Sequence, residues 1–326
     1  MLTQRHVETL ITLRLSESEI RQYLLELTPE FIDARTLELF VEALRATVED
    51  IGSWPAEGLP DTIDCSGTGG SGLSHFNTST AAAFVLAAGG LRVAKFGNRA
   101  MTSSCGSFDF LQAIGFPLGL PPERVPELLD ENGVVFLFAP QFYPVLARFT
   151  SARRSLDVKT IFNFLGPLLN PARPAFRVMG VSDADVHPHV AEYLSRCPGL
   201  KKALVVRAAN GLDEIDASGL SDIIEVEAGR VERTQYQPQD GDGEVLLASA
   251  ATAQENAELF QGLLDGSDVG SACYRLVCLN SGAGFYAAGK ASSINDGYAM
   301  AQELLACGAV ADKYEQARRS YASGAA

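Results

Sequence analysis

The stretch from Cys65 to Phe108 contains no aspartate and no glutamate, although the chain of 326 residues has 40 of them and a net charge of −14. The charged side chains within this stretch are Arg92, Lys95 and Arg99. A cation site built from carboxylates is therefore excluded inside it, whereas a locally positive neighbourhood favours a negatively charged ligand. We interpret this acid-free stretch as one part of a site for a polyanion.

Further absences limit the class of protein. The six cysteines form no C-x-x-C pair and have no histidine at zinc spacing, which favours reduced thiols in a cytoplasmic protein over a disulfide or zinc framework. No apolar run reaches about 18 residues and the N-terminus lacks a signal-peptide pattern, so we expect no membrane span. The acidic net charge argues against a nucleic-acid partner, which needs a basic face, but not against a small phosphorylated ligand.

The first part of the chain is predicted to be helical. Residues 1–50 have apolar side chains at helical spacing, and Ser16 with Glu19 forms a capping-box pattern. Residues 51–60 are rich in glycine and proline and are typical of a linker. This pattern fits a small helical domain followed by a larger domain, and it fits equally a helical layer of a single domain.

The pattern of apolar residues changes after the linker. Short apolar runs alternate with helical patterns, which predicts an α/β fold with a mostly parallel central sheet. The polar residues 227–247 are interpreted as a surface hairpin or loop, and helices are expected again over 251–264 and 293–306. The predicted strands are 62–65, 91–94, 134–138, 178–181 and 203–207.

A glycine-rich loop from Gly67 to Gly72 follows the first predicted strand and precedes an alanine-rich helix over 77–86. Glycines let a backbone approach a ligand closely, and the free N–H groups at a helix N-terminus bind phosphates without a lysine. The expected N-cap is one of Asn77, Thr78 and Ser79.

Two nucleotide-binding motifs fit this loop poorly. The dinucleotide fingerprint needs an acid about 20 residues further on, where this chain has Arg92 and Lys95. The Walker loop needs G-K-[ST] after its glycines, and Ser71-Gly72-Leu73 does not supply it. A tight turn without a ligand would leave the missing carboxylates unexplained.

The second half of the anion site is expected in residues 95–107. Small hydroxyl residues and glycines there offer hydrogen-bond donors, and Lys95 supplies a charge for phosphate. A ligand with two phosphate groups is expected to arrive with Mg²⁺, which prefers carboxylate and phosphate oxygens. Because the acid-free stretch has no carboxylate, the candidates are Asp213 and Glu214, which follow the strand predicted at 203–207.

Taken together, these segments resemble the anthranilate phosphoribosyltransferase family over nearly the whole chain. The distantly similar pyrimidine nucleoside phosphorylases share the fold but fit residues 162–172 poorly. The matching segments are Gly67-Thr68-Gly69-Gly70, Asn77-Thr78-Ser79-Thr80-Ala81, Lys95-Phe96-Gly97-Asn98-Arg99, Cys105-Gly106-Ser107, 160–172, Gly211-Leu212-Asp213-Glu214, Leu279-Asn280-Ser281 and Ala288-Gly289-Lys290.

The resemblance implies an Mg²⁺-dependent pentosyltransferase of tryptophan biosynthesis. It would move the phosphoribosyl group of phosphoribosyl pyrophosphate (PRPP) to the amine of anthranilate and release pyrophosphate. The resemblance also implies a helical domain over 1–60 with added helices from about 150–175, a donor-binding α/β domain over 61–326, and a homodimer built through the helical domains. The active site would lie in the cleft between the two domains.

By motif position, the resemblance assigns roles to individual residues. PRPP would be held by Gly67, Thr68, Gly69, Gly70, Asn77, Ser79, Thr80, Lys95 and Ser107. The aromatic acceptor, an amine with a carboxylate, would contact Gly67, Phe96, Asn98, Arg153 and Pro167. Mg²⁺ would be held by Ser79, Asp213 and Glu214. No side chain is assigned as an acid or base, and Lys95, Asn98 and Arg153 would act by positioning.

The chain departs from the family pattern at several positions. Ser71 stands where the family has aspartate, Phe96 where it has histidine, and Asp157 where it has glycine; Ser104 replaces a common lysine or arginine. The alternatives that these departures leave open are a working anthranilate enzyme, a paralogue with a different aromatic acceptor, and a PRPP-binding homologue without turnover.

Overall fold

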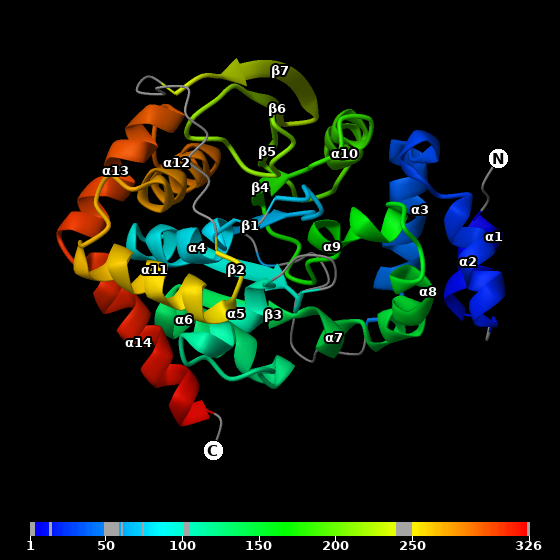
Figure 1. Ribbon diagram of the computed structural model, residues 1–326, viewed down its shortest axis with the longest axis horizontal. Coiled ribbons are helices and arrows are strands. Elements are labelled where there is room, and N and C mark those ends of the chain that lie inside the picture. Colours follow the sequence, from blue (N-terminus) through cyan, green and yellow to red (C-terminus); the bar gives the residue numbers. More distant parts are fainter. Residues whose placement is uncertain are drawn as a thin grey trace.

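The computed structural model describes residues 4–12, 15–48, 59, 61–73, 75–100, 105–238 and 250–324. Its centre is a seven-stranded sheet in the order β3-β2-β1-β4-β5-β6-β7 (Figure 1). The strands are β1 (Thr62–Gly67), β2 (Arg92–Gly97), β3 (Val134–Phe138), β4 (Phe176–Gly180), β5 (Lys202–Ala208), β6 (Ser221–Glu227) and β7 (Arg230–Tyr236).

The pairing from β3 through β5 is parallel, and the last two strands are antiparallel. Register pairs Cys65 of β1 with Val178 of β4, and Lys95 of β2 with Phe136 of β3. Because β1, β2, β4 and β5 run in the same direction, their carboxyl ends meet at one edge of the sheet. The predicted α/β fold with a mostly parallel sheet is confirmed.

Helices cover both faces of the sheet. Those in the first half of the chain are α1 (Gln4–Thr12), α2 (Glu17–Leu25), α3 (Ala34–Arg45), α4 (Thr78–Ala88), α5 (Ser107–Ala113), α6 (Val125–Asn132), α7 (Ala139–Phe142) and α8 (Thr150–Arg154). Those after them are α9 (Leu165–Leu168), α10 (Val186–Leu194), α11 (Ala253–Asp265), α12 (Ala272–Ala287), α13 (Ile294–Ala306) and α14 (Ala309–Gly324). Short 3₁₀ turns occur at Pro29–Phe31, Pro122–Arg124, Pro144–Phe149 and Ile161–Asn163.

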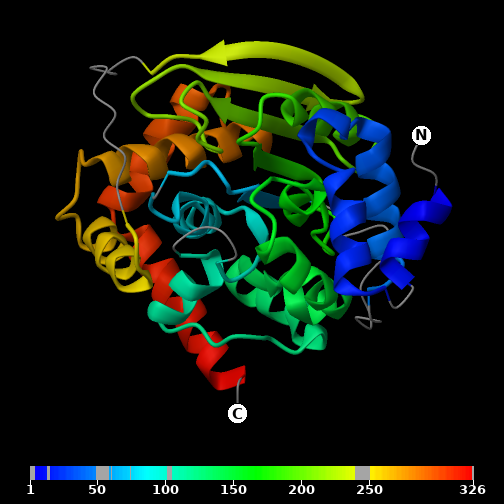
Figure 2. The same ribbon diagram turned by 45° about the vertical axis from the view of Figure 1, so that its right-hand side comes forward.

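Figures 1 and 2 show α1, α2, α3 and α8 together at one side of the molecule, beside the N-terminus. Residues far apart in sequence join this group: Ile161 N–H donates to the Leu27 carbonyl at 2.9 Å, and Arg148 donates to the Ile11 carbonyl at 2.7 Å. The predicted helices over 1–50 are present in the described residues, and the Ser16 capping box is formed.

Helix α4 lies against β1 and β2 and is buried on all sides. Residues 80–87 are all buried, and the Phe84 ring contacts the rings of Phe116, Phe136 and Phe260 at centroid distances of 5.3 to 5.6 Å. Fully burying an aromatic side chain contributes about 1.5–3 kcal/mol. Core packing, rather than side-chain capping at its ends, therefore fixes the position of α4 behind the glycine loop.

Strand β6 was not predicted, and β7 lies within the residues expected to form a surface hairpin or loop. The two strands form an antiparallel hairpin with its turn at Ala228 and Gly229. Their sequences carry too many charged residues for the apolar runs that marked the other strands. The expected loop over 239–247 and linker over 51–58 lie outside the described residues. Among the described residues, no helix has the length and apolar character needed to cross a membrane.

Candidate active site

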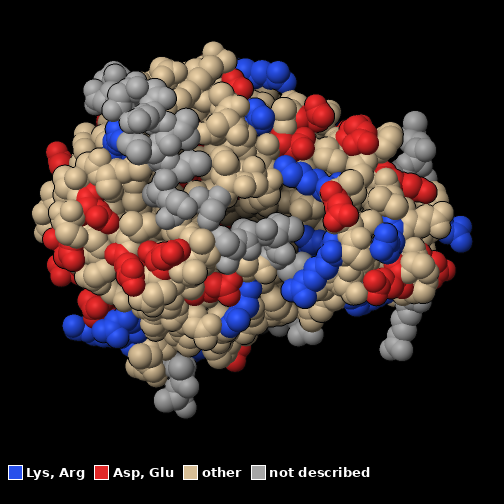
Figure 3. All heavy atoms as spheres, in the orientation of Figure 1, with Lys and Arg blue, Asp and Glu red and all other residues tan. Residues whose placement is uncertain are grey.

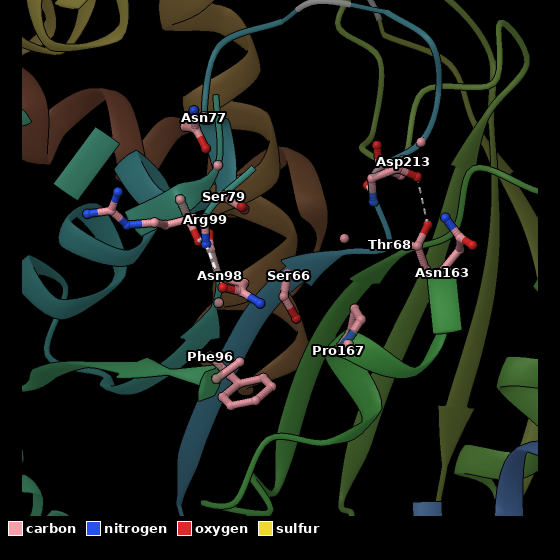
Figure 4. A pocket seen from close by; sticks show the side chains of 18 of the residues that line it. Ser66, Thr68, Asn77, Ser79, Phe96, Asn98, Arg99, Asn163, Pro167 and Asp213 are labelled. Carbon is pink, nitrogen blue, oxygen red and sulfur yellow. Dashed lines mark hydrogen bonds between the residues drawn. The ribbon is translucent and has the colours of Figure 1, made fainter. Parts of the chain in front are cut away.

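A cavity of about 280 Å³ opens where the parallel strands end, with walls from both halves of the acid-free stretch and from residues 153–167. In Figure 4, Ser79 and Asn98 lie on one side of this cavity and Asp213 on the other, with Phe96 and Pro167 below them. The face seen in Figure 3 is hollowed near its centre, and Lys and Arg side chains gather to the right of that hollow. The site is therefore locally positive on a chain of net charge −14.

The glycine loop leaves the end of β1 in a conformation that favours glycine. Gly69 and Gly70 have φ angles of +65° and +73°, a region that side chains with a Cβ adopt only with strain. Ser182, just beyond β4, holds the loop by donating from its hydroxyl to the Gly69 carbonyl at 2.8 Å. The Gly69 N–H donates to Asp213 Oδ2 at 2.6 Å, which joins residues 144 positions apart in sequence.

The acidic pair is held by close backbone packing. A Cβ at Gly180 would overlap the carbonyl of Asp213, and a Cβ at Gly67 would overlap its carboxylate. Asn280 of α12 clamps the same loop, because its side chain accepts from Ile215 N–H at 3.0 Å and donates to the Ile215 carbonyl at 3.1 Å. The sequence prediction that these acids serve the acid-free stretch agrees with this placement.

The electrostatics of the pair are unusual for surface acids. Burial, followed by repulsion from Asp213, raises the pKa of Glu214 to about 7 against the opposing effect of His75. Asp213 and Glu214 are 6% and 7% exposed, and Asp213 Oδ1 and Glu214 Oε2 have no hydrogen-bond partner among the described residues. Buried carboxylate oxygens without partners are costly unless a cation neutralises them, so these residues fit Mg²⁺.

No three His, Cys, Asp or Glu side chains of the described residues converge as a closed metal site. A Mg²⁺ ion would therefore take its remaining oxygens from hydroxyl groups, water and a bound phosphate. Ser79, whose hydroxyl lies in the first turn of α4, lines the same cavity as the two acids.

Lys95 is less accessible than the sequence indicated. Its ammonium donates to the Cys65 carbonyl at 2.7 Å and to Ser79 Oγ at 3.1 Å, and the residue is only 3% exposed. Burial lowers the pKa of Lys95, although the nearby Asp64 carboxylate opposes this. Asp64 is itself buried and accepts from Asn170 Nδ2 at 2.9 Å. The ammonium borders the cavity from a fixed position inside the sheet.

The N-terminus of α4 opens toward the glycine loop, but its cap differs from the prediction. Asn77 occupies the N-cap position without a capping bond, because its side chain and its N–H both bond to Asn256 Oδ1 of α11 at 3.0 and 2.8 Å. Asn77 and Ser79 line the cavity. Thr80 does not, since it is fully buried and its hydroxyl has no partner among the described residues.

The second wall follows β2. Asn98 Oδ1 accepts from the Arg99 N–H at 2.8 Å (Figure 4), and its carbonyl accepts from the Ser107 hydroxyl at 3.2 Å. Gly97 leaves room for this hydroxyl, which a Cβ there would displace. Asn98 and Ser107 thus line the same cavity as the glycine loop, whereas Ser104 lies outside the described residues.

The predicted acceptor residues all line the cavity. Arg153 stacks over Phe162, with its guanidinium carbon 5.6 Å from the ring centroid, and burial lowers its pKa. Phe96 is 4% exposed and meets the Tyr143 ring edge-on at 6.0 Å. The Pro167 carbonyl is fixed by Arg177, which donates to it at 2.8 Å. Gly67, also assigned to the acceptor, lines the cavity and lies against Asp213.

Of the other departures, Ser71 lies in the loop, where its hydroxyl accepts from Leu73 N–H at 3.3 Å, and Asp157 is exposed outside the cavity lining. Among the cavity residues to which the sequence analysis gave no role, His75 is the one beside the acidic pair. His75 lies beside both acids, with Nε2 3.8 Å from Asp213 Oδ1 and Nδ1 4.0 Å from Glu214 Oε1. Burial opposes its charged form, but the carboxylates of Glu214 and Asp213 raise the pKa of His75 overall. Its position between loop and helix was the only signal in the sequence.

Comparison with known proteins agrees with this site. A family model described as "Glycosyl transferase family, a/b domain" matches residues 59–311. The anthranilate phosphoribosyltransferase of Lactococcus lactis subsp. cremoris is 38% identical over 305 residues, 93% of this chain and 89% of the relative. The solved anthranilate phosphoribosyltransferase of Thermus thermophilus is 34% identical, with a TM-score of 0.86 over 98% of this chain and 96% of that chain.

A solved anthranilate phosphoribosyltransferase of Saccharomyces cerevisiae, in complex with PRPP and Mg, has a TM-score of 0.85 over 98% of this chain and 92% of that chain. Its identity of 23% makes this a likeness of fold alone. The Lactococcus relative and the matched family model carry the assignment further, because each spans most of this sequence, including the glycine loop and the acidic pair. The resemblance predicted from the motifs is thus confirmed, and the chain belongs to the anthranilate phosphoribosyltransferase family.

Proposed function

We propose that this protein catalyses the Mg²⁺-dependent transfer of the phosphoribosyl group from PRPP to the amine of anthranilate, with release of pyrophosphate. The observation that carries the proposal is the contact between the glycine loop and Asp213 at the end of the parallel strands. This contact places an anion-binding backbone and a buried acidic pair in one cavity, which is what a magnesium-bound pyrophosphate requires.

At the donor end, the backbone of the glycine loop and the start of α4 would bind the phosphate groups. The proposed contacts are Gly67, Thr68, Gly69, Gly70, Asn77, Ser79, Lys95 and Ser107, which line the cavity, whereas Thr80 is fully buried outside the lining and is no longer proposed as a contact. Ser79, Asp213 and Glu214 would hold the cation. When bound, Mg²⁺ neutralises charge on the departing pyrophosphate. Lys95 adds a positive charge whose position is fixed by its bonds to Cys65 and Ser79.

At the acceptor end, Arg153 would bind the anthranilate carboxylate. Its guanidinium is desolvated, and no carboxylate of the described residues forms an ion pair with it, so an acceptor carboxylate would supply the missing partner. Asn98 and Pro167 would orient the ring so that the amine faces the anomeric carbon of the donor. The lone pair of the amine then forms the C–N bond as the bond to pyrophosphate breaks, and positioning supplies most of the rate.

The test is a fluorescence assay of anthranilate with purified protein, PRPP and Mg²⁺. We expect anthranilate fluorescence to fall only when all three are present. Asp213→Asn should abolish turnover, and His189→Gln, a change on the outer surface of α10, should not. Persistence of full turnover in Asp213→Asn or without Mg²⁺ would contradict the proposed role of the acidic pair.

Phe96 favours a second candidate, an enzyme of the same type with a different aromatic acceptor. Its buried ring replaces a hydrogen-bonding histidine of the family pattern at the acceptor end and leaves that wall apolar beside Tyr143. PRPP binding without anthranilate turnover, together with turnover of another aromatic amine, would favour this candidate. PRPP binding with no acceptor consumed would favour a homologue without turnover.

The proposal extends to the assembly of the protein and to its pathway. A helical domain over residues 1–60, with added helices from about 150–175, would contact a second copy, since Leu25 and Phe31 are 49% and 63% exposed on that side. The α/β domain over 61–326 would bind PRPP. A cytoplasmic homodimer acting in tryptophan biosynthesis is the arrangement we propose, and light scattering of the purified protein tests its dimeric state.

A further inference from the structure

A second cavity, of about 420 Å³, lies apart from the candidate active site. It opens between the ends of α3, α9 and α10, and Figure 1 shows α9 and α10 beside α3. Its walls combine three arginines with apolar side chains, among them Arg45, Arg173, Arg177, Leu168, Leu194 and Leu200. No aspartate or glutamate of the described residues lines it. Its volume falls in the range of small-molecule sites, about 300–1,000 Å³.

Arg177 of β4 brings a buried positive charge to this cavity. The residue is 5% exposed, and no carboxylate of the described residues forms an ion pair with it. Burial lowers the pKa of Arg177; the Asp64 carboxylate opposes this effect, and the charge of Arg45 adds to it. Lys95 acts on the same Asp64 carboxylate. A buried guanidinium that shares its nearest countercharge is stabilised by a further anion.

Arg45, the last residue of α3, has donors to spare. Its Nη2 donates to the Leu168 carbonyl at 3.1 Å, and its Nε is buried without a partner among the described residues. Arg177 likewise donates to the Pro167 carbonyl at 2.8 Å. These bonds satisfy the end of α9, a structural role that arginine commonly has. That role uses one of the five N–H donors of each guanidinium and does not explain a third arginine or a cavity.

The third arginine has a strained backbone. Arg173 has a φ angle of +44°, a region that glycine adopts freely and that a residue with a Cβ adopts only at a cost. Its side chain, rather than its backbone, therefore accounts for an arginine at this position. Burial raises the pKa of Tyr143 to about 12, and the charges of all three arginines oppose this rise. The three positive charges are thus close together and repel one another until an anion neutralises them.

We propose that the second cavity is a regulatory site for a small carboxylate with an apolar or aromatic body, which places its carboxylate on the three arginines and its body against the leucines. The guanidinium fork matches a carboxylate, and the apolar wall has no counterpart on a bare inorganic anion. Because α9 separates the two cavities, Pro167 lines the active site and Leu168 lines the second cavity. A bound carboxylate competes for the guanidinium groups that fix the end of α9, so occupancy raises the KM for the acceptor. This coupling, unlike the binding, rests on the proposed function.

The probe is 4-iodobenzoate, titrated into the full-length protein by calorimetry and located in crystals by the anomalous signal of iodine. We expect iodine in the second cavity and binding at millimolar concentration or below. Iodobenzoate can also reach Arg153 in the active site, and the position of iodine separates the two sites. Sulfate tests the head group alone and should bind more weakly.

Arg173→Gly removes one cation and relaxes the backbone, so this variant should fold with an unchanged or higher melting temperature. We expect its dissociation constant for the second site to rise at least about tenfold, through loss of a charge-assisted hydrogen bond. The matched control is Ala228→Gly, which relaxes a φ angle of +49° in the β6–β7 turn and should leave binding unchanged. Direct competition at the active site would raise the anthranilate KM in Arg173→Gly as well, whereas the regulatory effect should be lost there.

The wild type alone decides the existence of the site. Iodine in the active site only, no binding at millimolar concentration, or sulfate binding as tight as that of iodobenzoate would overturn the proposal. Full affinity in a folded Arg173→Gly would also overturn it. An equal rise of the anthranilate KM in the wild type and in Arg173→Gly would contradict the regulatory role. Occupancy of the second cavity in a protein that does not consume anthranilate would support the site and contradict only the proposed function.

Discussion

Replacing Glu214 with glutamine should stabilise the metal-free protein while removing its response to metal. The carboxyl is buried beside Asp213, and its pKa rises from 4.5 to about 7. A shift of that size corresponds to about 3 kcal/mol of differential interaction, at about 1.4 kcal/mol per pKa unit. Holding this carboxylate ionised in the folded chain therefore opposes folding.

The direction in which the contribution of Glu214 to stability changes with pH follows from proton binding. Between the unfolded and folded pKa values the folded state binds more protons, so the contribution of Glu214 to stability falls as the pH rises from 4.5 to about 7. Glu214→Gln removes this dependence. We expect it to raise the free energy of unfolding by about 3 kcal/mol near pH 8.5, and by only about 1 kcal/mol near pH 5.5.

Metal should nearly cancel the difference between the two proteins at pH 8.5. A ligand at about 100 times its dissociation constant stabilises the folded state by about 2.7 kcal/mol, and the variant should lose this gain. The assay is urea denaturation with and without Mg²⁺ at both pH values, with Glu303→Gln on the exposed surface of α13 as the control. A variant less stable than the wild type at pH 8.5 without metal would refute the reasoning.

Other substitutions test the remaining walls of the cavity. Phe96→His should raise kcat/KM for anthranilate with the PRPP dissociation constant unchanged, although burying an imidazole costs about 1–3 kcal/mol of stability. An unchanged kcat/KM would show that Phe96 does not limit anthranilate turnover. Arg153→Lys should raise the KM for the acceptor by about tenfold or more through loss of the bidentate fork, with KM for PRPP as the internal control. Gly180→Ala should displace the Asp213 loop, lower the free energy of unfolding by more than about 2 kcal/mol and weaken Mg²⁺ binding, and a well-folded variant with normal binding would contradict that packing argument.

Much of the sheet was predictable because its five parallel strands are buried on both faces and appear as apolar runs. Strand β6 was missed because its acidic residues break such a run. Strand β7, whose residues are nearly all exposed, was expected only as part of a surface hairpin or loop. Placing Asp213 beside the glycine loop was also predictable, since carboxyl ends of parallel strands meet at one edge.

The details of the site depended on contacts between residues distant in sequence. Asn77 has a good capping side chain, but it makes no capping bond, and its amide nitrogen donates to Asn256, which is 179 residues away. Lys95 looked like a free phosphate ligand, and only the fold shows that it bonds to Cys65 and Ser79. His75 has no motif around it, so its neighbours could be known only from the structure.

The most direct test of the central claim is pyrophosphate release measured together with anthranilate consumption in the same reaction. The account predicts one pyrophosphate for each anthranilate consumed, with no release when anthranilate or Mg²⁺ is omitted and no release by Asp213→Asn. Pyrophosphate release at an equal rate without an acceptor, or no release at all while PRPP binds, would contradict the claim that this cavity joins PRPP to anthranilate.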